Sequence, residues 1–389
     1  MTEIVHGGAL AAVPGEPVLP RWWRSVDRLS MAAVAALFAI GLLLALAASP
    51  PLADRNGLPP FHYVTRQAMF GAVALSAMLI LSMLSPRAVR RLAGIGLLAG
   101  LVALALLPVF GTDYGKGAVR WYSLGFAALQ PSEFVKPCFV VISAWLMAAS
   151  TEIGGPPGKR MAFALLVLMV GLLAWQPDFG QATLITVAWL AMFFVLAVPL
   201  KMVFAIVATA LTGAVLAYQN SEHFARRIDG FLAAEVDPTT QVGFAINAIR
   251  NGGIFGVGVG EGTVKWSLPD AHTDFIIAVA AEEYGLVLVF VIIGLYALVV
   301  LRSLLRLMRE RDTFNRLAGA GLACVFGVQA AINLGVAVRL LPAKGMTLPL
   351  VSYGGSSLVA TGVLLGMLLA FTRRRPQGEI EDIIMLRSG

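Results

Sequence analysis

Long apolar runs repeat along almost the whole chain, and the short segments between them carry most of the polar and charged side chains. A helix that crosses the hydrocarbon core of a bilayer needs about 20 predominantly apolar residues. Ten runs approach that length and are predicted as spanning helices: 29–49, 65–84, 92–110, 131–149, 160–175, 181–198, 200–218, 273–300, 317–338 and 350–372. The pattern predicts an all-α, polytopic integral membrane protein of about ten helices, with its least distinct boundary at Pro199.

The distribution of positive charge predicts the orientation. If the N-terminus is cytoplasmic, 18 of the 29 Lys and Arg residues fall in segments on the cytoplasmic side, the arrangement that membrane insertion favours. Ten spans then place both termini in the cytoplasm, with tails at 1–28 and 376–389 around a membrane domain at 29–375. The longest outside segment, 219–272, lies between the seventh and eighth spans.

Composition agrees with this class. Only 13% of the residues are charged, against about 25% in soluble domains. The net charge of +7 is explained by arginines that anchor cytoplasmic loops, so we expect no nucleic-acid partner. Cys138 and Cys324 both lie inside apolar runs and give neither a disulfide framework nor metal-ligand spacing. The cytoplasmic segments are short and contain no nucleotide-binding loop.

The first candidate for chemistry is the segment 130–137 at the outer end of an apolar span. Pro131 suits a helix start, and Ser132 lies near the cap. Glu133 and Lys136 are three residues apart and share a helix face. An ionisable residue inside a span indicates a functional site by default. The alternative is an interfacial ion pair whose side chains reach the headgroups.

The second candidate is the segment 268–275, which contains His272, Thr273 and Asp274 and precedes a long apolar run. A helix from Thr273 to Val300 would be about 42 Å long, against a hydrocarbon core of about 30 Å. The helix therefore either projects outward or lines a polar cavity, and Asp274 lies at or above the outer membrane face. Partial desolvation there would raise the pKa of Asp274 and suit it to act as a general base.

The alternative for this second segment is structural. Asp270 and Asp274 would then act as helix caps that compensate the helix dipole and would have no catalytic role. Glu282 and Glu283 lie about 12 Å deeper along the predicted helix. Carboxylates at that depth must be paired or hydrated.

The third candidate is the segment 344–357, which contains Lys344, Ser352, Gly354, Gly355 and Ser356. Small residues that open a transmembrane helix allow close helix packing. The functional alternative is a surface of backbone and hydroxyl groups beside a lipid-linked substrate. The glycines at 252, 253, 256, 258, 260 and 262 lack dinucleotide-binding spacing, and we expect a flexible loop near the membrane surface.

Five motifs together resemble the SEDS family (shape, elongation, division and sporulation), in family order and over about residues 30–375. They are Pro131-Ser132-Glu133-Phe134-x-Lys136, Gln176-Pro177-Asp178-x-Gly180, Ala271-His272-Thr273-Asp274-Phe275, Glu282-Glu283-x-Gly285 and Leu348-Pro349-x-x-Ser352-Tyr353-Gly354-Gly355-Ser356-Ser357. Segments 260–265 and 344–350 look closer to the division branch than to the elongation branch. Asp270 departs from the family, where many relatives carry Glu.

The resemblance implies a peptidoglycan glycosyltransferase that polymerises lipid II at the outer face of the cytoplasmic membrane, at the division septum. It places the family's essential aspartate on Asp274 and its polar cavity on Glu133, Lys136 and Arg120. Besides lipid II and the nascent glycan strand, the implied partners are a class B penicillin-binding transpeptidase and other membrane proteins of the division machinery.

An inverting displacement of undecaprenyl diphosphate fits this expectation, because an α-linked donor becomes a β-linkage. Asp274 would take the proton of the acceptor 4-hydroxyl, and Arg120, Lys116, Lys136 and Lys344 are candidates to hold the diphosphate. The substrate site would also include Ser132, Glu133, His272, Thr273, Ser352, Gly354, Gly355 and Ser356. The sequence assigns no definite cofactor, and Glu133 and Asp274 could share a divalent cation, Mg²⁺ or Mn²⁺, with phosphate oxygens.

Three different functions also fit these residues. A transporter that flips lipid II would carry intramembrane Glu and Lys as well, and Glu282 and Glu283 support that function. The polar residues concentrate in the outer third of the membrane rather than along a path across it, which favours the enzyme. The second function is a polymerase of cell elongation, and the third is a scaffold that only recruits the transpeptidase.

Overall fold

The computed structural model describes residues 17–374 except 114–117, 126, 198–200, 202–203, 205–207, 209–210, 214, 217, 220–221, 233–237, 239, 269 and 343–344. The long helices are α2 (Arg28–Arg55), α3 (His62–Met83), α4 (Pro86–Phe110), α5 (Pro131–Ala149), α6 (Gly158–Trp175), α7 (Phe179–Val195), α11 (Ile276–Leu307), α12 (Thr313–Ala337) and α13 (Gly355–Thr372). Shorter elements are α1 (Val18–Ser25), α9 (Glu222–Leu232), α10 (Gln241–Gly252), the 3-10 helix η1 (Val264–Trp266), β1 (Tyr122–Ser123) and β2 (Ala128–Leu129).

The predicted helical bundle is confirmed. Eight described helices, α2–α6 and α11–α13, are long and apolar enough to cross a membrane, and α7 is a shorter apolar helix. These nine coincide with nine of the predicted spans. About half of the tenth, 200–218, falls outside the described residues. Helix α1 lies within the segment predicted as the N-terminal tail.

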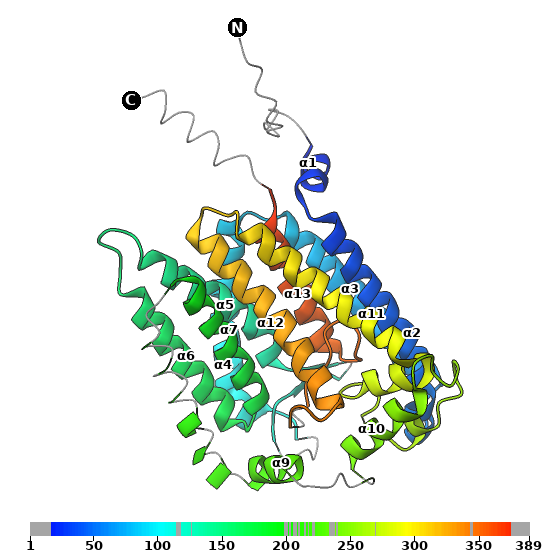
Figure 1. Ribbon diagram of the computed structural model, residues 1–389. Coiled ribbons are helices and arrows are strands. Elements are labelled where there is room, and N and C mark those ends of the chain that lie inside the picture. Colours follow the sequence, from blue (N-terminus) through cyan, green and yellow to red (C-terminus); the bar gives the residue numbers. More distant parts are fainter. Residues whose placement is uncertain are drawn as a thin grey trace.

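Three helices form the centre of the bundle. In α5, α12 and α13, 78%, 72% and 78% of the most apolar window is buried, against 22–28% in α3, α4, α6 and α11. The outer helices therefore present apolar side chains to lipid, while the central three can hold polar ones away from it. Helix α3 approaches α13 closely at Gly362, where a Cβ would lie 2.2 Å from the carbonyl oxygen of Ala74. Figure 1 shows α1 and the end of α13 at one end of the bundle and α9 and α10 at the other.

Helix α11 is not continuous, contrary to the prediction of one helix over 273–300. Regular helix begins at Ile276, and Gly285 has φ 76° and ψ −177°, a conformation essentially restricted to glycine. At this break the glycine-rich segment, residues 252–262, forms main-chain hydrogen bonds with the helix. The N–H of Val257 donates to the carbonyl of Glu282 at 2.9 Å, and the N–H of Leu286 donates to the carbonyl of Gly253 at 3.0 Å.

The expectation of a flexible glycine-rich loop is therefore wrong. The segment packs into the helix break. It can lie this close because glycine occupies several positions where a Cβ would clash with α11. A Cβ on Gly252 would lie 1.8 Å from the carbonyl oxygen of Ala281. The predicted long span is thus divided at Gly285 by a break that receives a loop.

Gly285→Ala is expected to prevent this packing. The new Cβ would lie 2.1 Å from the carbonyl oxygen of Ile254, and the backbone conformation at residue 285 excludes L side chains. We expect loss of most folded protein after detergent extraction, measured by size-exclusion chromatography. Gly294→Ala, on the same helix, is the matched control, because a Cβ at residue 294 would meet nothing within 4 Å. Equal yields of the two variants would contradict a structural role for the break.

Candidate active site

Glu133 and Lys136 occupy the first turns of α5, which opens with Pro131. Proline suits the first helical position because the N–H there has no partner within the helix. Nζ of Lys136 lies 2.9 Å from Oε2 of Glu133, and the two side chains are 2% and 5% exposed. The prediction that they share a helix face is confirmed. The pair is buried inside the bundle, which argues against an interfacial pair at the headgroups.

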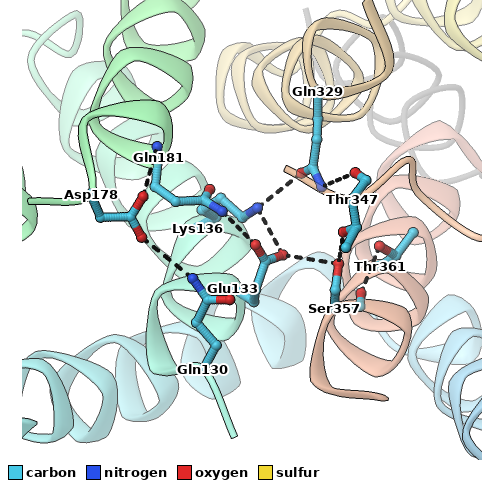
Figure 2. Close-up of polar contacts among 9 residues, drawn as sticks. All are labelled: Gln130, Glu133, Lys136, Asp178, Gln181, Gln329, Thr347, Ser357 and Thr361. Atoms are coloured by element: carbon cyan, nitrogen blue, oxygen red, sulfur yellow. Dashed lines mark hydrogen bonds and ion pairs between the residues drawn. The ribbon is translucent and has the colours of Figure 1, made fainter. Parts of the chain in front are cut away.

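Three side chains from other helices complete this pair, as Figure 2 shows. On α7, Nε2 of Gln181 donates to Oε1 of Glu133 at 2.5 Å. On α12, Oε1 of Gln329 accepts from Nζ of Lys136 at 2.9 Å. On α13, Oγ of Ser357 donates to Oε2 of Glu133 at 3.4 Å. Because α5, α7, α12 and α13 each contribute, the network holds four helices together around one buried ion pair.

Two amides on α12 connect the ion pair to the segment that carries Asp274. Nε2 of Gln329 donates to the carbonyl of Thr347 at 3.1 Å. One turn later, Nδ2 of Asn333 donates to the carbonyls of Met346 at 2.7 Å and Asp274 at 3.0 Å. Residues four apart lie on the same helix face. The position of Asp274 is therefore coupled, through α12, to the buried pair.

Asp274 lies in a tight turn just before α11. The N–H groups of Thr273 and Asp274 both donate to the carbonyl of Asp270, at 3.0 and 3.1 Å. Ser352 fixes the other side, because its Oγ donates to the carbonyl of Thr273 at 2.5 Å and accepts from the N–H of Leu348 at 2.9 Å. The side chain of Asp274 is half-buried. These main-chain contacts hold the residue without using its carboxylate.

The surroundings of Asp274 combine bare backbone with aromatic rings. A Cβ added to Gly345 would lie 3.5 Å from Oδ2 of Asp274, so the carboxylate borders a glycine. His272 lies against Tyr63 and Tyr353, with both ring centroids 5.7 Å from its own. The N–H of Tyr353 also donates to the carbonyl of His272 at 2.9 Å. Segments 270–275 and 345–353 thus form one unit around Asp274.

Arg120 holds the turn between α6 and α7. Its Nε donates to the carbonyl of Gln176 at 3.2 Å and its Nη2 to the carbonyl of Pro177 at 2.6 Å. Asp178, next in the turn, accepts from Nε2 of Gln130 at 3.3 Å. Burial raises the pKa of Asp178, and the charge of Arg120 opposes that rise. The guanidinium is half-buried, and its Nη1 donates no hydrogen bond to the described residues.

The remaining predicted site residues are distributed as follows. Ser132 is buried, and its Oγ has no hydrogen-bond partner among the described residues. Gly354 precedes the first residue of α13, Gly355, and Ser356 follows half-buried. Lys116 and Lys344 lie outside the described residues.

The carboxylates of Glu282 and Glu283 each bind other groups of the protein rather than lining an open path through the bundle. Oε1 of Glu282 accepts from the N–H groups of Thr263 and Val264, both at 2.9 Å. Oε1 of Glu283 forms a buried ion pair with Nζ of Lys265 at 2.5 Å. Both carboxylates therefore attach the segment around η1 to the first half of α11. Each carboxylate thus has a structural role through Oε1, which weakens the support for a transport path, while Oε2 of both is buried without a hydrogen-bond partner among the described residues.

The residues that sequence reasoning missed are Gln181, Gln329, Asn333 and Thr347. The first three are long polar side chains within predicted apolar spans, and that isolation is a signal for a buried polar site. Among the described residues, no three His, Cys, Asp or Glu side chains gather closely enough to hold a metal ion. The oxygens of Glu133 already accept from Lys136, Gln181 and Ser357.

Solved structures of known proteins share this arrangement of helices. A chain of a structure described as "Structural coordination of polymerization and crosslinking by a peptidoglycan synthase complex" aligns with a TM-score of 0.73 at 30% identity, covering 90% of this chain and 98% of that one. The rod shape determining protein RodA of Thermus thermophilus aligns with a TM-score of 0.67 at 29% identity, covering 90% and 97%. The similarity therefore extends over nearly the whole bundle.

Relatives found by sequence similarity also match over most of the chain. The probable peptidoglycan glycosyltransferase FtsW of Caulobacter vibrioides is 44% identical over 356 residues, covering 91% of both chains. The protein of the same description from Coxiella burnetii is 36% identical over 350 residues, covering 86% of this chain and 92% of its own. The model of the FtsW/RodA/SpoVE family, described as "Cell cycle protein", matches residues 27–377. The resemblance inferred from the five motifs is thus confirmed, and the chain belongs to the FtsW/RodA/SpoVE family of multi-pass membrane proteins.

Proposed function

We propose that this chain is a peptidoglycan glycosyltransferase that polymerises lipid II into glycan strands during septal wall synthesis. The observation that carries the proposal is a half-buried carboxylate, Asp274, whose main chain is held by Asp270 and by Asn333, one helical turn from the buried polar network on α12. The FtsW relatives, of which that of Caulobacter vibrioides is 44% identical, support the reaction class and the division role.

In the proposed reaction, Asp274 takes the proton of the acceptor 4-hydroxyl. The resulting oxygen nucleophile attacks the anomeric carbon of the donor sugar, and the bond from that carbon to the diphosphate breaks. Undecaprenyl diphosphate leaves with the bonding electron pair, and the α-linkage is replaced by a β-linkage. A general base of this kind contributes about 10²–10⁴ to the rate.

The departing diphosphate needs positive charge near it. Arg120 is suited to contact it, because Nη1 donates no hydrogen bond to the described residues. Lys136 is 2% exposed and bound to Glu133 and Gln329, so its proposed role is to position α5 and α12 rather than to touch the substrate. Lys116 and Lys344 stay candidates for direct contact.

The distribution of positive charge supports the proposed membrane orientation. The end of the bundle that holds α1 and the end of α13 also carries Arg28, Arg302, Arg306 and Arg373. Positive residues remain on the cytoplasmic side. Both termini would therefore be cytoplasmic, and Asp274, at the opposite end, would face the compartment where the wall is built. This arrangement would place the chemistry where a class B penicillin-binding transpeptidase could cross-link the new strand.

The similar structure described as a complex for polymerization and crosslinking supports such a partner. The function is tested by incubating the purified chain with labelled lipid II, with and without its cognate transpeptidase, and separating glycan products by gel electrophoresis. Glycan ladders that depend on the chain, and that lengthen or increase with the transpeptidase, are expected. Unchanged lipid II in both reactions would contradict the proposal.

A further inference from the structure

An open cavity lies at the end of the bundle opposite Asp274, where α2 begins and α11 ends. Its volume is about 350 Å³. The cavity is lined by five arginines and one carboxylate, with few other polar groups: Arg24, Arg28, Arg302, Arg306, Arg374 and Asp27. None of these residues belongs to the proposed glycosyltransferase site, so the cavity, here called the arginine pocket, requires its own explanation.

The single carboxylate is already bound by the protein. Asp27 is 2% exposed and caps α2 by accepting from the N–H of Leu29 and from Oγ of Ser30. Nε of Arg302 lies 2.6 Å, and Nε of Arg306 3.1 Å, from Oδ2 of Asp27. Asp27 therefore fixes the two guanidiniums of α11, but it balances only one of the five positive charges.

Arg302 also retains unused donors. It reaches Asp27 through Nε alone, its terminal amino groups donate no hydrogen bond to the described residues, and its side chain is 40% exposed. A planar guanidinium with two free amino groups binds phosphate oxygens in bidentate fashion. The charge excess and these donors together indicate that the pocket takes a phosphate-bearing anion.

The neighbouring helix indicates where that anion comes from. Helix α1 is held to the bundle by Trp22, whose Nε1 donates to Oγ of Ser82 at 3.0 Å. Leu19 and Trp23 on the same helix are 62% and 46% exposed. Exposed aromatic and aliphatic residues beside arginines are typical of a helix that lies in the headgroup layer of an anionic membrane. The pocket adjoins this helix and includes Leu29, which is 46% exposed.

We propose that the arginine pocket binds the headgroup phosphate of an anionic phospholipid, such as phosphatidylglycerol or cardiolipin, from the leaflet on the side of the termini. The phosphate contacts Arg302 and Arg374, and the acyl chains lie along exposed apolar residues that include Leu29. Basic pockets between transmembrane helices are suited to such headgroups. The lipid neutralises the excess charge and holds α1, α2 and α11 together at this end.

The test is native mass spectrometry of the detergent-solubilised full chain, titrated with phosphatidylglycerol or with phosphatidylcholine of identical acyl chains. Wild type is expected to bind phosphatidylglycerol selectively. Arg302→Gln with Arg374→Gln should weaken that binding by about twenty-five-fold, since each cation near an anionic lipid contributes about a factor of five. The control is Arg87→Gln with Arg91→Gln, which removes two exposed charges near the start of α4, outside the pocket, and should leave binding unchanged.

If Arg302→Gln prevents folding, Arg28→Gln with Arg374→Gln removes two pocket charges without removing a partner of Asp27. Inorganic phosphate is added in a separate series to distinguish a free anion from a headgroup. Equal binding of the two lipids by wild type would overturn the proposal, as would equal losses in the pocket and control variants. Displacement of the lipid by equimolar phosphate would overturn the assignment to a lipid.

Discussion

Asp274→Asn is expected to reduce lipid II polymerisation by about 10²–10⁴-fold, because asparagine keeps the size of the side chain but cannot accept the acceptor's proton. The fold around residue 274 should be unaffected. The contacts with Asp270 and Asn333 that hold this residue use its N–H and carbonyl groups. The measurement is the initial rate of glycan formation from labelled lipid II by purified protein with its transpeptidase.

Asp270→Asn is the matched control for this experiment. It makes the same chemical change four residues earlier in the same turn, where φ is 54° and asparagine is tolerated. This variant should polymerise at close to the wild-type rate, and both variants should retain binding of the transpeptidase. Near-normal synthesis by Asp274→Asn would remove Asp274 as the base. Equal losses in both variants would indicate that the turn, rather than one carboxylate, is required.

Lys136→Met is expected to destabilise the bundle strongly. Methionine fills a similar volume but leaves the carboxylate of Glu133 buried without its cation. Removing one partner of a buried ion pair costs about 3–5 kcal/mol. Since the pair also connects α5 to α12 through Gln329, we expect both a lower unfolding temperature in detergent and loss of polymerisation.

The double variant Glu133→Gln with Lys136→Met separates these two effects. It removes both charges, so no carboxylate at residue 133 is left without its cation, and the amide oxygen of glutamine can still accept from Nε2 of Gln181. The unfolding temperature should recover toward wild type, while polymerisation should stay low because the coupling to α12 is not restored. A double variant no more stable than Lys136→Met would show that the unpaired charge is not what destabilises the single variant.

Sequence patterns predicted those features that depend on neighbours along the chain. The spacing of Glu133 and Lys136 within one helix determines that they share a face, and the structure pairs them at 2.9 Å. The partners Gln181 and Gln329 could not be predicted, because they come from α7 and α12. Which face of one helix meets which face of another depends on packing of the whole bundle, and sequence spacing carries no such information.

Other misses have a different physical origin. The apolar run that contains Gly285 looks like one helix, because a glycine in an apolar sequence gives no indication of its φ angle. The substrate contact of Ser352 stays a prediction, but sequence spacing did not indicate that its hydroxyl joins Thr273 to Leu348. A serine that opens a loop is equally suited to bind a ligand or the backbone, and only the position of the backbone decides between them. Lys116 and Lys344 stay predictions.

Whether this chain polymerises lipid II or transports it is decided by assaying one preparation of the protein for both activities. The purified chain and its transpeptidase are assayed for glycan synthesis in detergent, where no bilayer separates two compartments. The same protein is then reconstituted into vesicles and assayed for translocation of labelled lipid II. If the chain is a polymerase, wild type makes glycan strands in detergent and Asp274→Asn does not. Translocation by both wild type and this variant, with no glycan made by either, would exclude polymerisation as the function.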